Sequence, residues 1–177
     1  RIPAKNVEKT IFMFRQHDSN EASEKKMGSK ILIIDDDAHI RKMLSFIFKG
    51  YGYMEVIAVE DYFTGVAAIS QTEFDVIFCD INLGEKTGVD FMETVNQKKI
   101  GSPVILITGK PELDTAISAL RLGAFDYLKK PLKGSDLISV AEKALEYKRE
   151  LRGKRQKETE NLDKITDIIE TYQSHLD

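Results

Sequence analysis

Short apolar segments alternate with longer amphipathic segments through the middle of this 177-residue chain. The apolar segments are rich in β-branched residues and do not alternate with polar ones, which is typical of strands buried on both faces. They lie at residues 31–34, 55–59, 76–78, 104–107 and 125–128. Because helical segments separate them, they predict strands of one parallel sheet.

Each predicted strand is followed by a segment whose apolar residues recur at intervals of three and four, the spacing of one helix face. These segments lie at residues 40–48, 62–69, 89–95, 116–122 and 137–145. Five strands alternating with five helices predict an α/β fold, a doubly wound five-stranded parallel sheet covered by helices on both faces. We assign this domain to residues 29–147.

The segment 148–177 has a different pattern, because it is rich in charge and carries a heptad spacing of apolar residues. The heptad positions are Leu162, Ile165, Ile169, Tyr172 and Leu176. Their register extends back to residue 144, so we expect one helix to continue from the domain into an amphipathic C-terminal extension. We favour a self-associating or linker helix, and the alternative is a helix that docks on its own domain.

Residues 1–28 are mostly polar, with one apolar patch at residues 11–14. We interpret them as an N-terminal extension, either a tag or a flexible leader. The alternative is a short strand or helix that docks Phe12 and Phe14 on the surface of a partner.

The overall composition bears on whether the protein contacts nucleic acid, forms disulfides or crosses a membrane. Hydrophobic residues make up 42% of the chain and the net charge is −3, which gives no reason to expect direct contact with nucleic acid. The single cysteine, Cys79, cannot form an internal disulfide, and no apolar segment is long enough to cross a membrane. We therefore expect a cytoplasmic protein without a membrane partner.

Acidic residues follow two of the predicted strands. Asp35 and Asp36 come directly after the first strand, and Asp80 ends the third. The carboxyl ends of parallel strands meet at one edge of the sheet, so these carboxylates converge if the two strands are neighbours. Repelling carboxylates need a cation, and an oxygen-only set suits Mg²⁺. We expect the next residue, Asp37, to cap the following helix instead.

Two further polar residues end the remaining strands, Thr108 after the fourth and Lys130 after the fifth. A hydroxyl and an ammonium beside a metal-bound carboxylate suit the oxygens of a phosphoryl group. Asp80, nearest the centre, is then the candidate nucleophile.

Residues 30–147 resemble the receiver domain of two-component response regulators. The resemblance is carried by the segments ILIIDDD, DVIFCDINL, VILITGK and GAFDYLKKPL, which span essentially the whole domain. It implies a flavodoxin-like receiver fold, with Asp80 accepting a phosphoryl group from a sensor histidine kinase or a phosphotransfer protein. It also implies a signalling phosphoprotein of a phosphorelay rather than an enzyme.

The resemblance assigns roles to the other site residues. Asp35 and Asp36 resemble the acidic pair that orders Mg²⁺, and the backbone carbonyl of Asn82 is expected to complete the metal shell. Thr108 resembles the switch hydroxyl and Tyr127 the aromatic switch residue. Lys130 resembles the lysine that pairs with the acyl phosphate, and its bond to Pro131 is a candidate cis peptide.

The chain departs from the family at residues 84–88, which read GEKTG where a proline commonly stands. We expect a looser loop there. We also expect phosphorylation to act on the C-terminal helix or on an output domain outside this sequence, with a homodimer through the last domain helices and residues 148–177.

Two other functions stay open. One is a phosphorylation-independent dimerisation scaffold. The other is a phosphatase of the haloacid dehalogenase type, in which Asp35 attacks and Asp37 acts as the acid. Against the phosphatase, His39 stands where that motif usually has Thr or Val.

Overall fold

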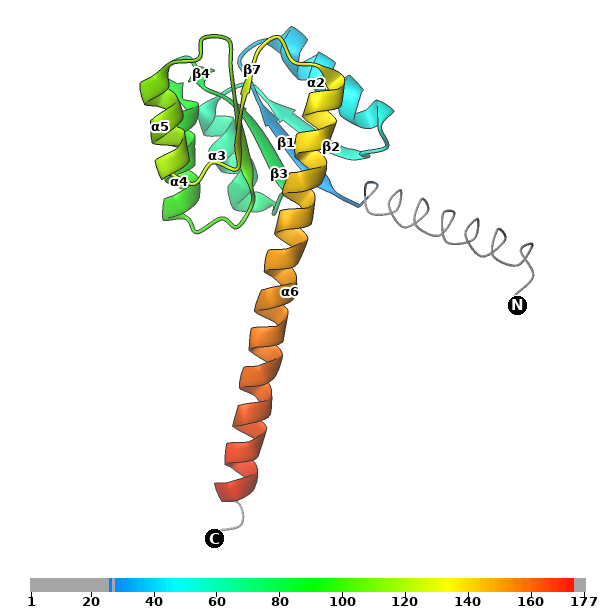
Figure 1. Ribbon diagram of the computed structural model, residues 1–177, viewed down its shortest axis with the longest axis vertical. Helices are drawn as coiled ribbons and strands as arrows, with labels where there is room; N and C mark the ends of the chain where they lie inside the picture. The colour runs from blue at the N-terminus through cyan, green and yellow to red at the C-terminus, as the bar shows by residue number, and fades with distance from the viewer. Residues whose placement is uncertain (1–25, 27, 174–177) are drawn as a thin grey trace, which may run out of the picture.

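A computed structural model describes residues 26 and 28–173 of the chain, with the backbone alone for residues 167–173. The main sheet has five parallel strands in the order β2-β1-β3-β6-β7 (Figure 1). These strands are Lys30–Ile34 (β1), Glu55–Val59 (β2), Val76–Asp80 (β3), Val104–Thr108 (β6) and Asp126–Lys129 (β7). The predicted fold class is confirmed, whereas the interpretation of residues 1–25 lies outside the described part of the chain.

The sheet has a hydrophobic core on each face. Side chains alternate along β1, so Ile31 and Ile33 enter one core while Leu32 and Ile34 enter the other. The first core is covered by α2 (Ala38–Gly50) and α6 (Gly134–Gln173), as Figure 1 shows. The second is covered by α3 (Tyr62–Gln71), α4 (Gly88–Gln97) and α5 (Leu113–Arg121).

Burial differs between the central and the edge strands. Every residue of β3 and β6 is buried, as are the last four of β1, whereas β2 and β7 are partly exposed. The expectation of burial on both faces is therefore wrong for the two edge strands. An edge strand has a neighbour on one side only, and here the covering helices leave it partly open to solvent.

Polar residues just before the helices set where several of them begin. The Asp37 carboxylate accepts a hydrogen bond from the backbone N–H of His39 at 2.7 Å, which confirms the predicted cap of α2. Asp61 forms a capping box with Thr64 at the start of α3. Thr87 does the same with Asp90 at the start of α4. Each cap satisfies backbone donors that the helix itself leaves free.

The segment after β3 forms a hairpin, and the expectation that it is looser than in the family stays a prediction. β4 (Asn82–Leu83) pairs antiparallel with β5 (Lys86–Thr87). Gly84 supplies the positive φ of +82° in the turn. Gly88 then packs on the end of β3, where an added Cβ would lie 2.5 Å from the Asp80 carbonyl oxygen. The glycines of GEKTG thus allow a tight turn and a close approach.

Helix α6 runs without a break from the receiver sheet into the C-terminal extension, as predicted. Its first part packs on the sheet and the rest projects beyond the domain (Figure 1). Two heptad residues of the projecting part, Leu162 and Ile165, are 63% and 53% exposed. The side chains of Ile169 and Tyr172, and all of Leu176, lie outside the described residues. None of the described helices has the length and apolar character needed to cross a membrane.

Candidate functional site

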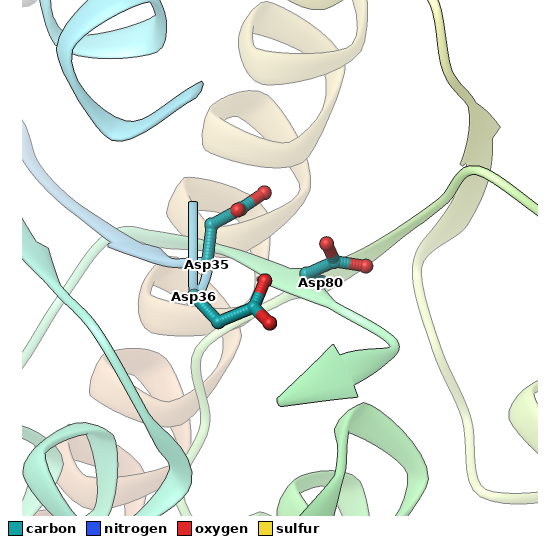
Figure 2. Close-up of side chains that lie close together, drawn as sticks. All are labelled: Asp35, Asp36 and Asp80. Carbon is teal, nitrogen blue, oxygen red and sulfur yellow. The ribbon is translucent and has the colours of Figure 1, made fainter. Parts of the chain in front are cut away.

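Three carboxylates gather at the carboxyl ends of β1 and β3. The two strands are neighbours in the sheet, with Ile34 paired to Cys79, so the residues that follow lie side by side. One oxygen from each of Asp35, Asp36 and Asp80 falls within 4.8 Å of the others (Figure 2). Asp35 and Asp80 are 1% and 5% exposed, whereas Asp36 faces solvent. The predicted convergence of these carboxylates is therefore seen.

Lys130, which follows β7, brings a positive charge to the buried pair. Its ammonium donates a hydrogen bond of 2.7 Å to Asp35 Oδ2 and a second bond to Asp80 Oδ2. The Lys130–Pro131 peptide bond is cis, as the resemblance implies. One cation thus lies between two carboxylates that would otherwise repel each other at short range.

The second oxygen of each buried carboxylate is held by a backbone N–H. Asp35 Oδ1 accepts from the amide of Asp37 at 2.9 Å, and Asp80 Oδ1 accepts from the amide of Asn82 at 3.2 Å. Among the residues that the structure describes, no side chain or backbone donor contacts the Asp36 carboxylate. The carboxylates of Asp35 and Asp80 are therefore held in place, whereas both oxygens of Asp36 are available to a metal ion.

Burial sets the electrostatics of this cluster. Burial raises the pKa of the Asp35 carboxyl, and the hydrogen bonds from Lys130 and Asp37 only partly offset that rise. For Lys130, burial acts to lower the pKa, but the bonds to Asp35 and Asp80 outweigh it and the pKa is raised. Lys130 is therefore a cation near neutral pH, and its single ammonium does not match the three carboxyl groups around it, so the cluster still suits a second cation.

Thr108 and Tyr127 lie on the neighbouring strands β6 and β7 and make no hydrogen bond with the carboxylates. The Thr108 hydroxyl, at the end of β6, donates to the carbonyl of Lys110 at 3.1 Å and accepts from its N–H at 3.1 Å. Tyr127 lies on the neighbouring strand β7, and its hydroxyl is buried without a hydrogen-bond partner among the described residues. Neither hydroxyl is bonded to the carboxylates.

Arg41 is a contributor that the sequence patterns did not single out. Its guanidinium, on the first turn of α2, donates to the backbone carbonyls of Asp35 at 2.7 Å and Asp36 at 3.0 Å. It holds the acidic loop in place from the side of the backbone. In the sequence Arg41 is one polar residue on an amphipathic helix, and no spacing distinguishes it from its solvated neighbours.

Comparison with known proteins gives the class of this fold and site. The family described as the response regulator receiver domain matches residues 31–142. The chain belongs to this family, whose members are signalling phosphoacceptors of two-component systems.

Individual relatives agree with this assignment. The transcriptional regulatory protein ZraR of Salmonella typhimurium is 32% identical over 120 residues, which cover 68% of this chain and 27% of ZraR. A CheY-like receiver domain structure from Methanospirillum hungatei is 29% identical with a TM-score of 0.66, covering 69% of this chain and 97% of that one. A beryllofluoride-activated NtrC4 receiver domain dimer is 28% identical with a TM-score of 0.63, covering 67% and 98%. The chain thus spans only 27% of the length of this curated relative.

Proposed function

We propose that this chain is the phosphoacceptor part of a response regulator, in which Asp80 receives a phosphoryl group from a histidine kinase or a phosphotransfer protein. The observation that carries the proposal is the position of Asp80. Its carboxylate is almost fully buried at the end of the central strand β3, bonded to Lys130 and grouped with Asp35 and Asp36. A carboxylate held next to an ammonium and beside a candidate metal site is suited to attack phosphorus.

The acidic cluster supports a magnesium site as part of this proposal. Asp35, Asp36 and Asp80 offer only oxygen ligands, which suits a hard divalent cation, and the backbone carbonyl of Asn82 is the further ligand. Bound there, Mg²⁺ supplies electrostatic stabilisation of the transferring phosphoryl oxygens.

Three residues then have separate roles in phosphoryl transfer. An oxygen of Asp80 attacks the phosphorus of a phosphohistidine, the bond between phosphorus and the histidine nitrogen breaks, and Asp80 becomes an acyl phosphate. Lys130 moves its hydrogen bond from the free carboxylate to a phosphoryl oxygen. The Asn82 N–H, which now holds Asp80 Oδ1, fixes the direction of attack.

Thr108 and Tyr127 are the proposed switch. The Thr108 hydroxyl now bonds only the Lys110 backbone, so it is free to exchange that contact for a phosphoryl oxygen. Tyr127, on the adjacent strand β7, has a buried hydroxyl without a partner in the described structure, so its side chain loses no hydrogen bond if it moves. The pair would alter the face formed by α5, β7 and α6.

The proposal also covers how the switch acts on the rest of the protein. Helix α6 connects the receiver directly to a projecting segment with exposed Leu162 and Ile165. We propose that this segment pairs with a second copy or transmits the change to a further domain. A homologous receiver, that of NtrC4, is described as a dimer in its activated form.

The test is the intact mass of the chain after incubation with acetyl phosphate and Mg²⁺. The unmodified chain should gain one phosphoryl group, and Asp80→Asn should gain none. Asp114→Asn is a matched control, because Asp114 lies on the exposed first turn of α5. It should be phosphorylated like the unmodified chain.

Two other outcomes are informative. No adduct on the unmodified chain would contradict the phosphoacceptor proposal and leave the dimerisation scaffold. Turnover of a generic phosphomonoester would point to the phosphatase instead. The position of Asp37 argues against the phosphatase, since its carboxylate caps α2.

A further inference from the structure

The C-terminal helix makes a second set of contacts at the opposite end of the sheet from the carboxylates. Lys148, the first residue past the predicted domain boundary, is only 2% exposed. Its ammonium donates to the backbone carbonyl of Phe74 and to Ser102 Oγ at 3.1 Å, and it pairs with Glu73 at 2.9 Å. All three protons of this ammonium therefore have a partner.

The next turns of α6 continue the same contact. Arg152 pairs with Glu73 at 2.9 Å and with Asp75 at 3.0 Å. Arg155 lies over Gly101, where an added Cβ would stand 3.3 Å from its guanidinium. The positions 148, 152 and 155 lie on one face of the helix, and that face is turned toward the receiver domain.

These contacts reach the beginnings of three strands. Glu73, Phe74 and Asp75 come directly before β3, and Ser102 comes shortly before β6. Asp75 also accepts a hydrogen bond of 2.8 Å from the backbone N–H of Lys30, the first residue of β1. The other ends of β1, β3 and β6 carry Asp35, Asp80 and Thr108.

The burial of Lys148 distinguishes its contacts from ordinary surface ion pairs, whereas Glu73 and Arg152 are largely exposed. An exposed pair contributes little to stability, and many contribute nothing measurable. A buried ammonium is different, because it is costly unless its partners stay in place. Helix α6 is therefore favoured in positions that keep the Lys148 ammonium within hydrogen-bond distance of Phe74, Ser102 and Glu73.

We propose that Lys148 and Arg152 on α6, with Glu73 and Asp75 before β3, form a latch that fixes the C-terminal helix to the N-terminal edge of the sheet. Residues 134–155 then move as one body with the receiver domain. This inference does not depend on Asp80 being the phosphoacceptor.

The latch separates the heptad register into two parts with different partners. Lys148 is buried against the receiver and Leu151 is half-buried, so these register positions are used by the chain itself. Leu162 and Ile165 are exposed and remain available to a second copy. Docking on the chain's own domain is thus seen for the first part of this segment, whereas self-association stays a prediction for the exposed part.

The test is amide hydrogen exchange of the full chain carrying Glu73→Gln, which removes the carboxylate shared by Lys148 and Arg152. Exchange across residues 144–156 should rise roughly two- to fivefold, because the helix now opens locally from the domain. The core of β1 and β6 should be unchanged. Glu150→Gln is the matched control, since no described residue pairs with Glu150, and it should leave exchange as it was.

A second variant weakens the same contact in a different way, so that a folding defect in one variant can be recognised. Lys148→Met keeps the volume of the side chain and removes the buried charge, so it weakens the latch without leaving an unpaired ion. It should raise exchange over the same residues. Unchanged exchange in both variants would overturn the latch, and so would a rise spread evenly over the whole receiver domain.

Discussion

The ammonium of Lys130 lies 2.7 Å from a carboxylate oxygen of Asp35, although 95 positions separate the two residues in the chain. The contact joins the residue after β1 to the residue after β7, across the intervening strands of the sheet. A buried carboxylate is thus kept in place by a charge from the far edge of the site, which makes Lys130 a structural residue as well as a chemical one.

Replacing Lys130 by Met should destabilise the metal-free protein by about 3 kcal/mol, because it leaves the buried carboxylates of Asp35 and Asp80 without their cation. Urea unfolding in the presence of a chelator measures this. Lys129→Met is the control, since Lys129 is exposed at the end of β7, and it should change stability little. An equal loss in both variants would mean that the charge of Lys130 is not what matters.

Magnesium should stabilise the protein, and Asp36→Asn should weaken magnesium binding by on the order of tenfold. Asp36 is exposed and unpaired in the described structure, so the substitution should barely change stability without metal. Thermal unfolding over a Mg²⁺ titration separates the two quantities. A large loss of stability without metal would instead assign Asp36 a structural role.

Glu73 should make stability depend on acid pH. The hydrogen bonds from Arg152 and then Lys148 lower its pKa from the ordinary 4.5 to about 2. A carboxyl whose pKa is lower in the folded state stabilises the fold above its unfolded pKa and loses that effect as the pH falls through the folded pKa. The stability difference between the unmodified chain and Glu73→Gln should therefore be present at pH 6 and vanish between about pH 4.5 and pH 2.

The size of that difference should stay below about 1 kcal/mol, because the Glu73 side chain is 66% exposed and solvent screens its ion pairs. Chemical unfolding at a series of pH values gives the comparison. A difference that persists unchanged at the lowest pH would show that the carboxylate charge is not its source.

Self-association should depend on Leu162. Leu162→Asp places a charge in the exposed heptad face and should weaken dimerisation at least about tenfold, since the buried area of a leucine is lost. Lys164→Gln makes the same one-unit change in charge at an exposed position away from the heptad face and its flanks, and should have little effect. Sedimentation velocity of the full chain measures both. Equal weakening by the two variants would indicate a general charge effect rather than a helical seam.

Local patterns determined the elements of the fold. Apolar runs such as 104–107 become strands and three-four spacings such as 40–48 become helices because burial of a strand or helix face depends on that spacing. The caps behave likewise, since Asp37 acts on an N–H two residues away. The GEKTG segment was harder to interpret, because its glycines fit an open loop as well as a hairpin packed on β3.

The meeting of the site residues depends on the order of the strands in the sheet, which no local sequence pattern contains. Asp35 and Asp80 meet only because β1 and β3 are neighbours, and Lys130 reaches them only because β7 ends at the same edge. From the sequence, the adjacency of these strands was only a condition, and the structure supplies the order.

Tertiary structure alone decided the roles of Arg41 and Lys148. Their partners include backbone carbonyls, and that of Phe74 lies 74 positions before Lys148 in the chain. A lysine in a charged helical segment has the same local pattern whether it is solvated or buried. Its environment is set by where the helix crosses the sheet, and that depends on packing across the whole domain.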